Sequence, residues 1–187
     1  MVIERPPAAV LWLTGLSGAG KSTIAGRVYR ELCARAVPTE LLDGDAVRLL
    51  SPAGFSRAER DAHVTRVGFL ASRLEHHGVT SVCALISPYA DARSCVRQMC
   101  RRFIEVYIAT PLAECEKRDI KGLYARARRG DIESFTGISD PYEPPVNPEI
   151  TLDTTVMSLD EAVGAVMAAW AAGVGLDDSV ASAARQG

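Results

Sequence analysis

The sequence predicts an α/β fold in which helices cover a mainly parallel sheet of five strands. Short apolar segments, suited to strands that are buried on both faces, alternate with segments whose apolar residues recur at helical spacing. A glycine-rich stretch follows the first strand directly and opens the first helix. With 187 residues, 48% of them hydrophobic, the chain is long enough for one domain with its own core.

The strands and helices are expected in a regular order. Strands are expected at residues 9–14, 39–42, 79–86, 103–108 and 150–152. Helices are expected at about 21–36, 57–78, 91–102 and 159–170, with a helical turn around residue 48. Two residue pairs match the capping box that begins a helix: Ser56 with Glu59, and Ser158 with Glu161. Thr110 and Pro111 predict an N-cap and a first-turn proline for a further helix.

The chain divides into an N-terminal arm at 1–8, a domain at 9–172 and a flexible tail at 173–187. Within the domain, the segment at about 118–148 begins with five basic residues between Arg118 and Arg129, continues with glycine and proline, and lacks a long apolar face. We expect this segment to form a mobile, partly helical lid. A solvated basic surface is the alternative.

Composition excludes several classes of protein. The net charge of −2 gives no reason to expect a nucleic-acid partner or an anionic membrane surface. No apolar run is long enough to span a bilayer, and the N-terminus does not resemble a signal peptide. The five cysteines show neither metal-site spacing nor a disulfide framework. We therefore expect reduced cysteines in a cytoplasmic protein.

Residues 15–23, which read GLSGAGKST, match the spacing of a P-loop. The glycines let backbone N–H groups approach an anion, and the following helix points its partial positive end at the same place. Lys21 brings an ammonium group to the β- and γ-phosphates, and Ser22 offers a hydroxyl to Mg²⁺. The sequence therefore predicts a three-layer P-loop NTPase or kinase fold that binds a nucleoside triphosphate.

Two acids follow the second strand, at the edge of the sheet where ligands gather in such folds. Asp43 and Asp45 lie two residues apart. One could hold the Mg²⁺ shell through water, and the other could accept a proton from an attacking hydroxyl. An aspartate-rich turn is the structural alternative.

Cations and aromatic residues outside the periodic apolar stripes suggest an acceptor site. Arg48 and Arg60 flank Phe55, and Phe135 lies in the polar segment at 118–148. Guanidinium groups pair with phosphate or sulfate, and aromatic faces stack on a base. Solvated helix faces for the arginines and a core position for Phe55 are the alternatives.

With these motifs in place, the chain resembles the adenylylsulfate kinase family, whose members transfer the γ-phosphoryl group of ATP to the 3′-hydroxyl of adenosine 5′-phosphosulfate. The resemblance covers about residues 9–170. Its matching stretches are 15–23, 42–45 with 47–48, 54–56 with Arg60, 86–89, 118–119, 121–124, 135–138, 141–143 and 147–149.

The resemblance implies a role for each matching residue. Catalytic roles fall to Lys21, Asp43, Asp45, Ser87 and Lys121. ATP binding falls to Gly15, Ser17, Gly18, Ala19, Gly20, Lys21, Ser22, Thr23 and Arg118. Acceptor binding falls to Asp45, Arg48, Phe55, Arg60, His63, Ile86, Ser87, Tyr89, Lys121, Leu123, Phe135 and Thr136. Mg²⁺ would be held through Ser22 and Asp43.

The resemblance further implies a homodimer, and an adenine ring held between Phe55 and Phe135. Ser87 matches a position described in the family as a phosphoserine intermediate. Direct in-line transfer needs no such step, and no base adjoins Ser87 in the sequence.

The chain departs from the family pattern on the acceptor side. Ala46 and His63 stand where asparagine is usual, Ala90 stands where arginine is usual, and the loop at 49–53 is about two residues shorter. Such changes could alter which nucleotide is accepted. A kinase of another nucleotide or small hydroxyl compound is therefore the first alternative, and a nucleotide-binding regulator without transfer activity is the second.

Overall fold

The computed structural model describes residues 7–50, 54 and 56–175. The strands are β1 Val10–Thr14, β2 Thr39–Asp43, β3 Thr80–Ala84, β4 Phe103–Ile108 and β5 Ile150–Leu152. The helices are α1 Lys21–Ala34, α2 Gly44–Leu50, α3 Arg57–His76, α4 Ala90–Met99, α5 Leu112–Arg118, α6 Leu123–Arg128 and α7 Leu159–Gly173.

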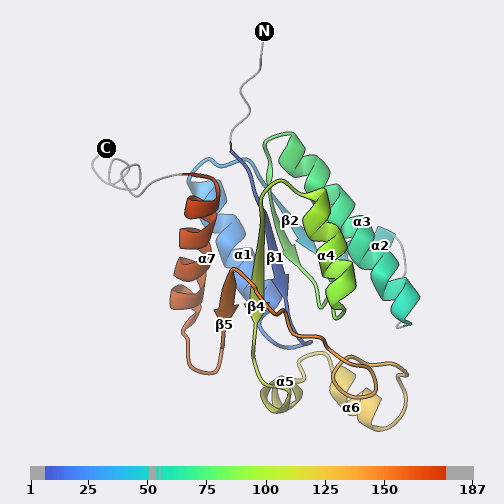
Figure 1. Cartoon of the computed structure of the whole chain (residues 1–187). Helices are drawn as coiled ribbons and strands as arrows, with labels where there is room; N and C mark the ends of the chain where they lie inside the picture. Colours follow the sequence, from blue (N-terminus) through green and yellow to red (C-terminus); the bar gives the residue numbers. More distant parts are fainter. Residues whose placement is uncertain (1–6, 51–53, 55, 176–187) are drawn as a thin grey trace.

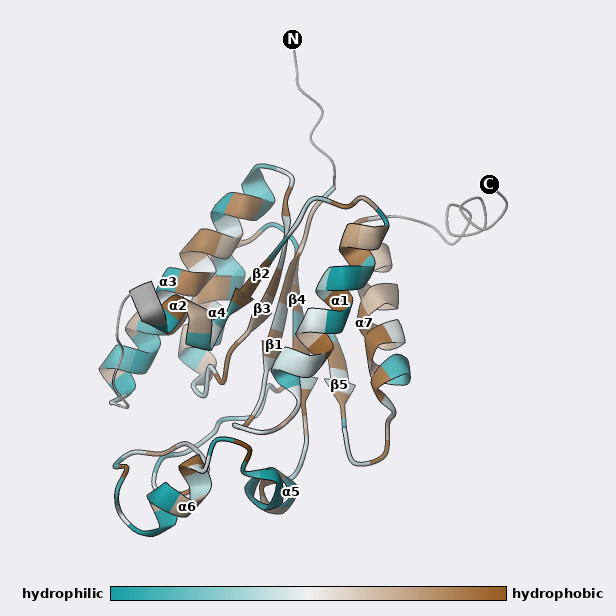
Figure 2. Ribbon diagram, turned by 180° about the vertical axis from the view of Figure 1, so that it is seen from behind, coloured by the Kyte–Doolittle hydropathy of each residue, from teal (hydrophilic) through white to brown (hydrophobic). Residues whose placement is uncertain are grey.

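The five strands form one sheet in the order β2-β3-β1-β4-β5, and every neighbouring pair is parallel. This confirms the predicted α/β fold. Helices α1 and α7 cover one face of the sheet and α3 and α4 cover the other, while α5 and α6 lie beyond the carboxyl ends of the strands (Figure 1). The apolar strands occupy the middle of this three-layer arrangement (Figure 2).

The central strand β1 explains how the two cores form. All five of its residues are buried. Successive side chains of a strand point to opposite faces, so Leu11 and Leu13 join the core under α1 and α7, while Val10 and Trp12 join the core under α3 and α4. Continuous burial on both faces accounts for the uninterrupted apolar sequence.

Both predicted capping boxes are confirmed at the starts of α3 and α7. The prediction for Thr110 is wrong. Pro111 occupies the N-cap position of α5, and no side chain caps that helix. The Thr110 hydroxyl donates instead to the Ala19 carbonyl at 2.9 Å, because the end of β4 lies against the glycine-rich loop.

The segment at 118–148 contributes more to the core than its sequence suggests. Tyr124, Ala127, Ile132 and Phe135 are buried in the main core. They come from a six-residue helix and the turns after it, so they give no long periodic stripe. Mobility of this segment stays a prediction.

The chain ends differ from the expected boundaries where the structure describes them. Ala8, expected in the arm, is buried, and α7 continues to Gly173 with Val174 buried behind it. Residues 176–187 of the predicted flexible tail lie outside the described residues. Within the described part, no helix has the length and apolar character needed to cross a lipid bilayer.

A tight contact between α3 and α4 gives the first testable prediction. A Cβ atom on Gly68 would lie 2.4 Å from Cγ2 of Val96, whose branched side chain is fully buried. Gly68→Ala should therefore lower the free energy of unfolding by about 1–3 kcal/mol. Chemical denaturation measures the change.

Gly164→Ala in α7 is the matched control, because no atom lies within 4 Å of the added Cβ. It should raise the free energy of unfolding by about 0.5–1 kcal/mol, since alanine suits a helix interior better than glycine. Equal effects of the two substitutions would contradict the packing argument.

Candidate active site

A cavity of about 470 Å³ lies beyond the carboxyl ends of the strands. Its wall comes from the loop after β1, the starts of α1, α2 and α3, the turn after β3, and the segment around α5 and α6. The structure brings most of the predicted site residues to this wall: Ser17, Gly18, Gly20, Lys21, Ser22, Thr23, Asp43, Asp45, Arg48, Arg60, His63, Ile86, Ser87, Arg118, Lys121, Leu123 and Phe135. Gly15, Ala19, Tyr89 and Thr136 are not among the lining residues, and Phe55 lies outside the described part of the chain.

The glycine-rich loop approaches its neighbours too closely for side chains. Gly15 has φ +152°, and a Cβ atom there would lie 2.6 Å from the Ile108 carbonyl oxygen. Gly20, with φ +107°, precedes the first residue of α1. Both positions require glycine, which allows the backbone to curl tightly at the start of the helix.

Lys21 folds back onto the loop that precedes it. Its Nζ donates to the carbonyl oxygens of Gly15 at 3.0 Å and Leu16 at 2.7 Å. Burial lowers the pKa of this ammonium group to about 8. The charge is held beside the loop by weak acceptors, so a phosphate entering the loop would offer it a stronger partner.

Ser22 and Asp43 form a pair of oxygen ligands at the loop. The Ser22 hydroxyl donates to Asp43 Oδ2 at 2.8 Å, while Asp43 Oδ1 accepts from the backbone N–H of Asp45 at 2.9 Å. A hydroxyl and a carboxylate in contact are the hard donors that Mg²⁺ prefers. The residues present therefore fit the metal that the P-loop implies.

Asp45 and Lys121 pair across the cavity, from the first turn of α2 to the loop before α6. Burial raises the pKa of the Asp45 carboxyl, but the hydrogen bond and charge of Lys121, with Arg48 and Lys21 nearby, outweigh burial and lower that pKa overall. Asp45 is therefore ionised at neutral pH and carries an acceptor oxygen into the cavity.

The opposite side of the cavity holds buried cationic and imidazole groups on α3. Arg60 is 3% exposed and donates from Nη2 to the Ser134 carbonyl at 2.8 Å. His63, one turn later, is 4% exposed, and neither ring nitrogen reaches hydrogen-bonding geometry with a described residue. Burial first, then the charges of Arg48 and Arg66, lower the pKa of His63, so a neutral imidazole faces the cavity.

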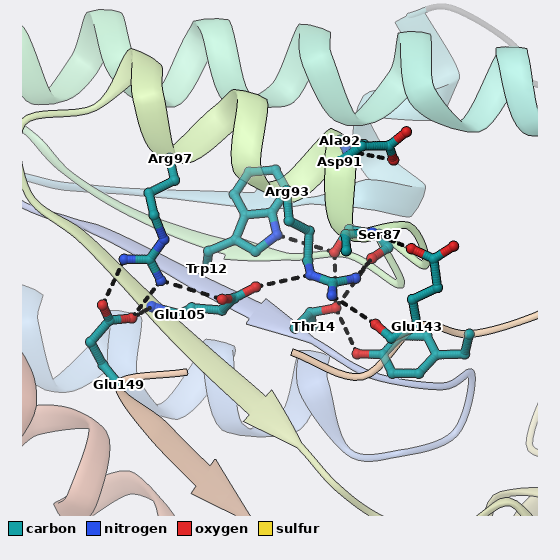
Figure 3. A network of polar contacts seen from close by, with 12 residues as sticks. Trp12, Thr14, Ser87, Asp91, Ala92, Arg93, Arg97, Glu105, Glu143 and Glu149 are labelled. Carbon is teal, nitrogen blue, oxygen red and sulfur yellow. Dashed lines mark hydrogen bonds and ion pairs between the residues drawn. The ribbon is translucent and has the colours of Figure 1, made fainter. Parts of the chain in front are cut away.

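Ser87 lies at the cavity wall with its hydroxyl already engaged (Figure 3). Trp12 Nε1 donates to Ser87 Oγ at 3.1 Å, and Ser87 Oγ donates to Thr14 Oγ1 at 3.0 Å. Neither partner is a base. The surroundings of Ser87 therefore suit a structural hydroxyl better than a nucleophile.

Like Arg60, His63 and Ser87, three further predicted acceptor-binding residues are buried. The Tyr89 hydroxyl donates to Asp140 Oδ2, and its ring packs in the core under α3 and α4. Thr136 is 1% exposed. Phe135 lines the cavity but is only 2% exposed, and its ring meets Tyr124 edge-on with centroids 5.1 Å apart. The sequence places Phe135 outside the periodic apolar stripes, yet its ring belongs to the main core, because the turns of this segment pack inward.

Two hydroxyl groups bind carbonyl oxygens of the glycine-rich loop, although no motif in the sequence indicates this role. Tyr124 donates to the Ser17 carbonyl at 2.9 Å, and Thr154 donates to the Ala19 carbonyl at 3.2 Å. Arg118 then donates to Thr154 Oγ1 at 2.9 Å, beside the loop. The available signal was weak: Thr154 follows a strand end, where parallel sheets collect functional groups.

Comparisons with known proteins agree on one family. A family model described as adenylylsulphate kinase matches residues 7–153. The adenylyl-sulfate kinase of Gloeothece citriformis is 50% identical over 159 residues, which cover 84% of this chain and 90% of that protein.

Solved structures agree as well. The APS kinase CysC of Mycobacterium tuberculosis, in complex with AMPPNP and APS, has a TM-score of 0.83 at 40% identity and covers 87% of this chain and 97% of that one. A hexameric APS kinase from Thiobacillus denitrificans has a TM-score of 0.64 at 35% identity, covering 88% of this chain and 29% of that one.

The burial of Phe135 gives a stability prediction. Phe135→Ala should lower the free energy of unfolding by about 3–5 kcal/mol, because a large buried ring is lost and a cavity remains. Chemical denaturation measures it. Ile120→Ala, on the same segment but 83% exposed, should stay within about 0.5 kcal/mol. A small effect of Phe135→Ala would mean that the ring is not part of the core.

Proposed function

Because the chain belongs to the adenylylsulphate kinase family, we propose that it transfers the γ-phosphoryl group of ATP to the 3′-hydroxyl of adenosine 5′-phosphosulfate. The observation that carries this proposal is the shared cavity, in which the P-loop lysine and the Ser22–Asp43 pair face Asp45, Lys121 and the cationic side of α3. The same cavity therefore contains the proposed site for the phosphoryl donor and the proposed site for the acceptor.

ATP binds on the P-loop side in this proposal. Backbone N–H groups of the loop and the N-terminus of α1 surround the β-phosphate, as in other P-loop proteins. Lys21 exchanges the loop carbonyls for phosphate oxygens, and Arg118 lies beside Gly18 at the mouth of the loop. Both cations stabilise the negative charge that develops during transfer.

Ser22 and Asp43 would hold Mg²⁺, since they supply adjacent oxygen ligands. Bound Mg²⁺ would neutralise charge on the β- and γ-phosphates. This leaves Asp45 for the acceptor, because its carboxylate pairs with Lys121 while the Ser22 hydroxyl bonds to Asp43.

Asp45 accepts the proton of the 3′-hydroxyl as that oxygen attacks the γ-phosphorus, while the bond from the γ-phosphorus to the bridging oxygen breaks and ADP leaves. Entry of the acceptor separates Lys121 from Asp45 and lets the ammonium group approach the transferring phosphoryl group. Arg48, Arg60 and His63 bind the phosphosulfate and ribose. Transfer is direct, and Ser87 holds the turn after β3 without becoming phosphorylated.

A cytoplasmic location and a homodimer complete the proposal. All five cysteines are free, as in proteins of a reducing compartment. The hexameric relative from Thiobacillus denitrificans supports assembly of several copies but does not specify two. The slightly acidic chain gives no support for a nucleic-acid or membrane partner.

A different nucleotide acceptor is the second candidate, and His63 is the observation that favours it. Its buried ring lines the cavity, and neither nitrogen has a hydrogen-bond partner among the described residues, so a polar group of the acceptor would satisfy one of them. A coupled ATP assay with adenylylsulfate beside a panel of other nucleotides separates the two candidates. The product should carry a 3′-phosphate.

Lys21→Ala tests the donor site. Loss of a charge that contacts the transferred group should reduce kcat by about 10²–10³-fold. Lys117→Ala is the control, because that side chain is 80% exposed and lies on α5. Near-native turnover of folded Lys21→Ala would refute the site.

Asp43→Ala tests the metal assignment. The Mg²⁺ concentration for half-maximal activity should rise about 10–100-fold, because a ligand or its close support is lost. Asp160→Ala is the control, because it removes an exposed carboxylate of α7 that forms an ion pair with Arg27. It should leave the Mg²⁺ dependence unchanged. An unchanged Mg²⁺ titration in Asp43→Ala would reject the assignment.

A further inference from the structure

Arg93 on α4 is a buried charge that lies outside the lining of the cavity. It is 3% exposed, and each of its three side-chain nitrogens donates a hydrogen bond (Figure 3). Nε donates to Glu105 Oε1 at 2.9 Å, Nη1 to the Ser87 carbonyl at 2.7 Å, and Nη2 to the Glu143 carbonyl at 2.7 Å. One planar group thereby joins β4, the turn after β3 and the chain at residue 143.

The two main-chain partners of Arg93 belong to segments that build the acceptor side. Ser87 lies on the cavity wall and has φ +38°, a left-handed conformation that a serine does not adopt without support. Glu143 lies on a segment that we name the strap, residues 134–149. The strap also carries Phe135 at the cavity and the carbonyl of Ser134 that binds Arg60.

Further bonds fasten the strap to the same turn. The Glu143 N–H donates to the Pro88 carbonyl at 2.8 Å, and its carboxylate accepts from the Ala90 N–H at 2.7 Å. The Tyr142 hydroxyl lies 2.9 Å from Thr14 Oγ1. Arg93 is the charged group between the strap and the turn after β3, and the other hydrogen bonds connect the same two segments around it.

The cost of burying Arg93 is offset by a balanced set of charges. Glu105 receives Arg93 on one oxygen and Arg97 Nη2 on the other, at 3.3 Å. Glu149, at the far end of the strap, accepts from Arg97 at 2.6 Å and from the Glu105 N–H at 2.6 Å. Two arginines and two glutamates alternate, which leaves no buried charge without a partner in this group.

We propose that Arg93 is a positioning residue for the acceptor: it holds the Ser87 turn and the strap together, so that the acceptor side of the cavity is rigid before the acceptor arrives. This inference rests on the proposed function. Lysine cannot replace the guanidinium, because a single ammonium group cannot reach three acceptors that lie in three fixed directions.

The test compares Arg93→Lys with Arg97→Lys, which changes the neighbouring arginine of the same network but contacts neither the Ser87 turn nor Glu143, and meets the strap only at Glu149, its last residue. Arg93→Lys should raise the KM for adenylylsulfate about ten- to a hundredfold, because small displacements of binding groups are costly, and should change the KM for ATP less than about twofold. Arg97→Lys should leave both values near those of the wild type. An equal rise of both KM values in Arg93→Lys, or an unchanged KM for adenylylsulfate, would overturn the proposal.

Amide hydrogen exchange gives a second readout that needs no activity. In Arg93→Lys, residues 134–143 should exchange faster, while β2 exchanges as in the wild type. Unchanged exchange in the strap would overturn the proposal.

If Arg93→Lys fails to fold, Tyr142→Phe replaces it, since it removes one strap bond and keeps the ring. It should raise the KM for adenylylsulfate several-fold, and a wild-type value would count against the strap. A wild-type enzyme that neither binds nor phosphorylates adenylylsulfate would reject the proposed function, and the exchange measurement would then decide the role of Arg93 alone.

Discussion

The close contact between the loop after β1 and the ends of the neighbouring strands is the constraint on which the cavity depends. Gly15 lies against the Ile108 carbonyl, and a Cβ on Gly18 would lie 3.1 Å from the carbonyl oxygen of Cys115. Hydroxyl groups of Thr110, Thr154 and Tyr124 bind carbonyl oxygens of the same loop. The loop is thus shaped by three separate parts of the chain, and its conformation is a property of the whole sheet edge.

Local patterns allowed the fold and the candidate donor site to be predicted from the sequence. Uninterrupted apolar strands, capping residues and the spacing of Gly15 to Thr23 each express a physical requirement within a few neighbouring residues. The pair of acids after β2 was found in the same way, because a strand end marks a place in the sheet as well as in the sequence. These features needed no knowledge of distant contacts.

The parts that escaped prediction depend on contacts between distant residues. Thr110 precedes a proline and has the side chain of an N-cap residue. Its hydroxyl nevertheless donates to the carbonyl of Ala19, 91 residues earlier in the chain. Tyr89 follows a strand at the correct edge, but its ring turns into the core and its hydroxyl finds Asp140. No local pattern reveals which of several partners a hydroxyl or an arginine will meet, since that choice is made by packing. The network around Arg93 has no sequence signal for the same reason.

Two of the three bonds of Arg93 end on main-chain oxygen atoms, those of Ser87 and Glu143. A hydrogen bond to a carbonyl oxygen holds the backbone in place and does not require a particular side chain at that residue. At Ser87 and Glu143, this support for the wall does not depend on the side chain, so strap positions whose side chains make no contact of their own are open to replacement during evolution. A scaffold of this kind lets the choice of acceptor diverge among descendants without a new fold.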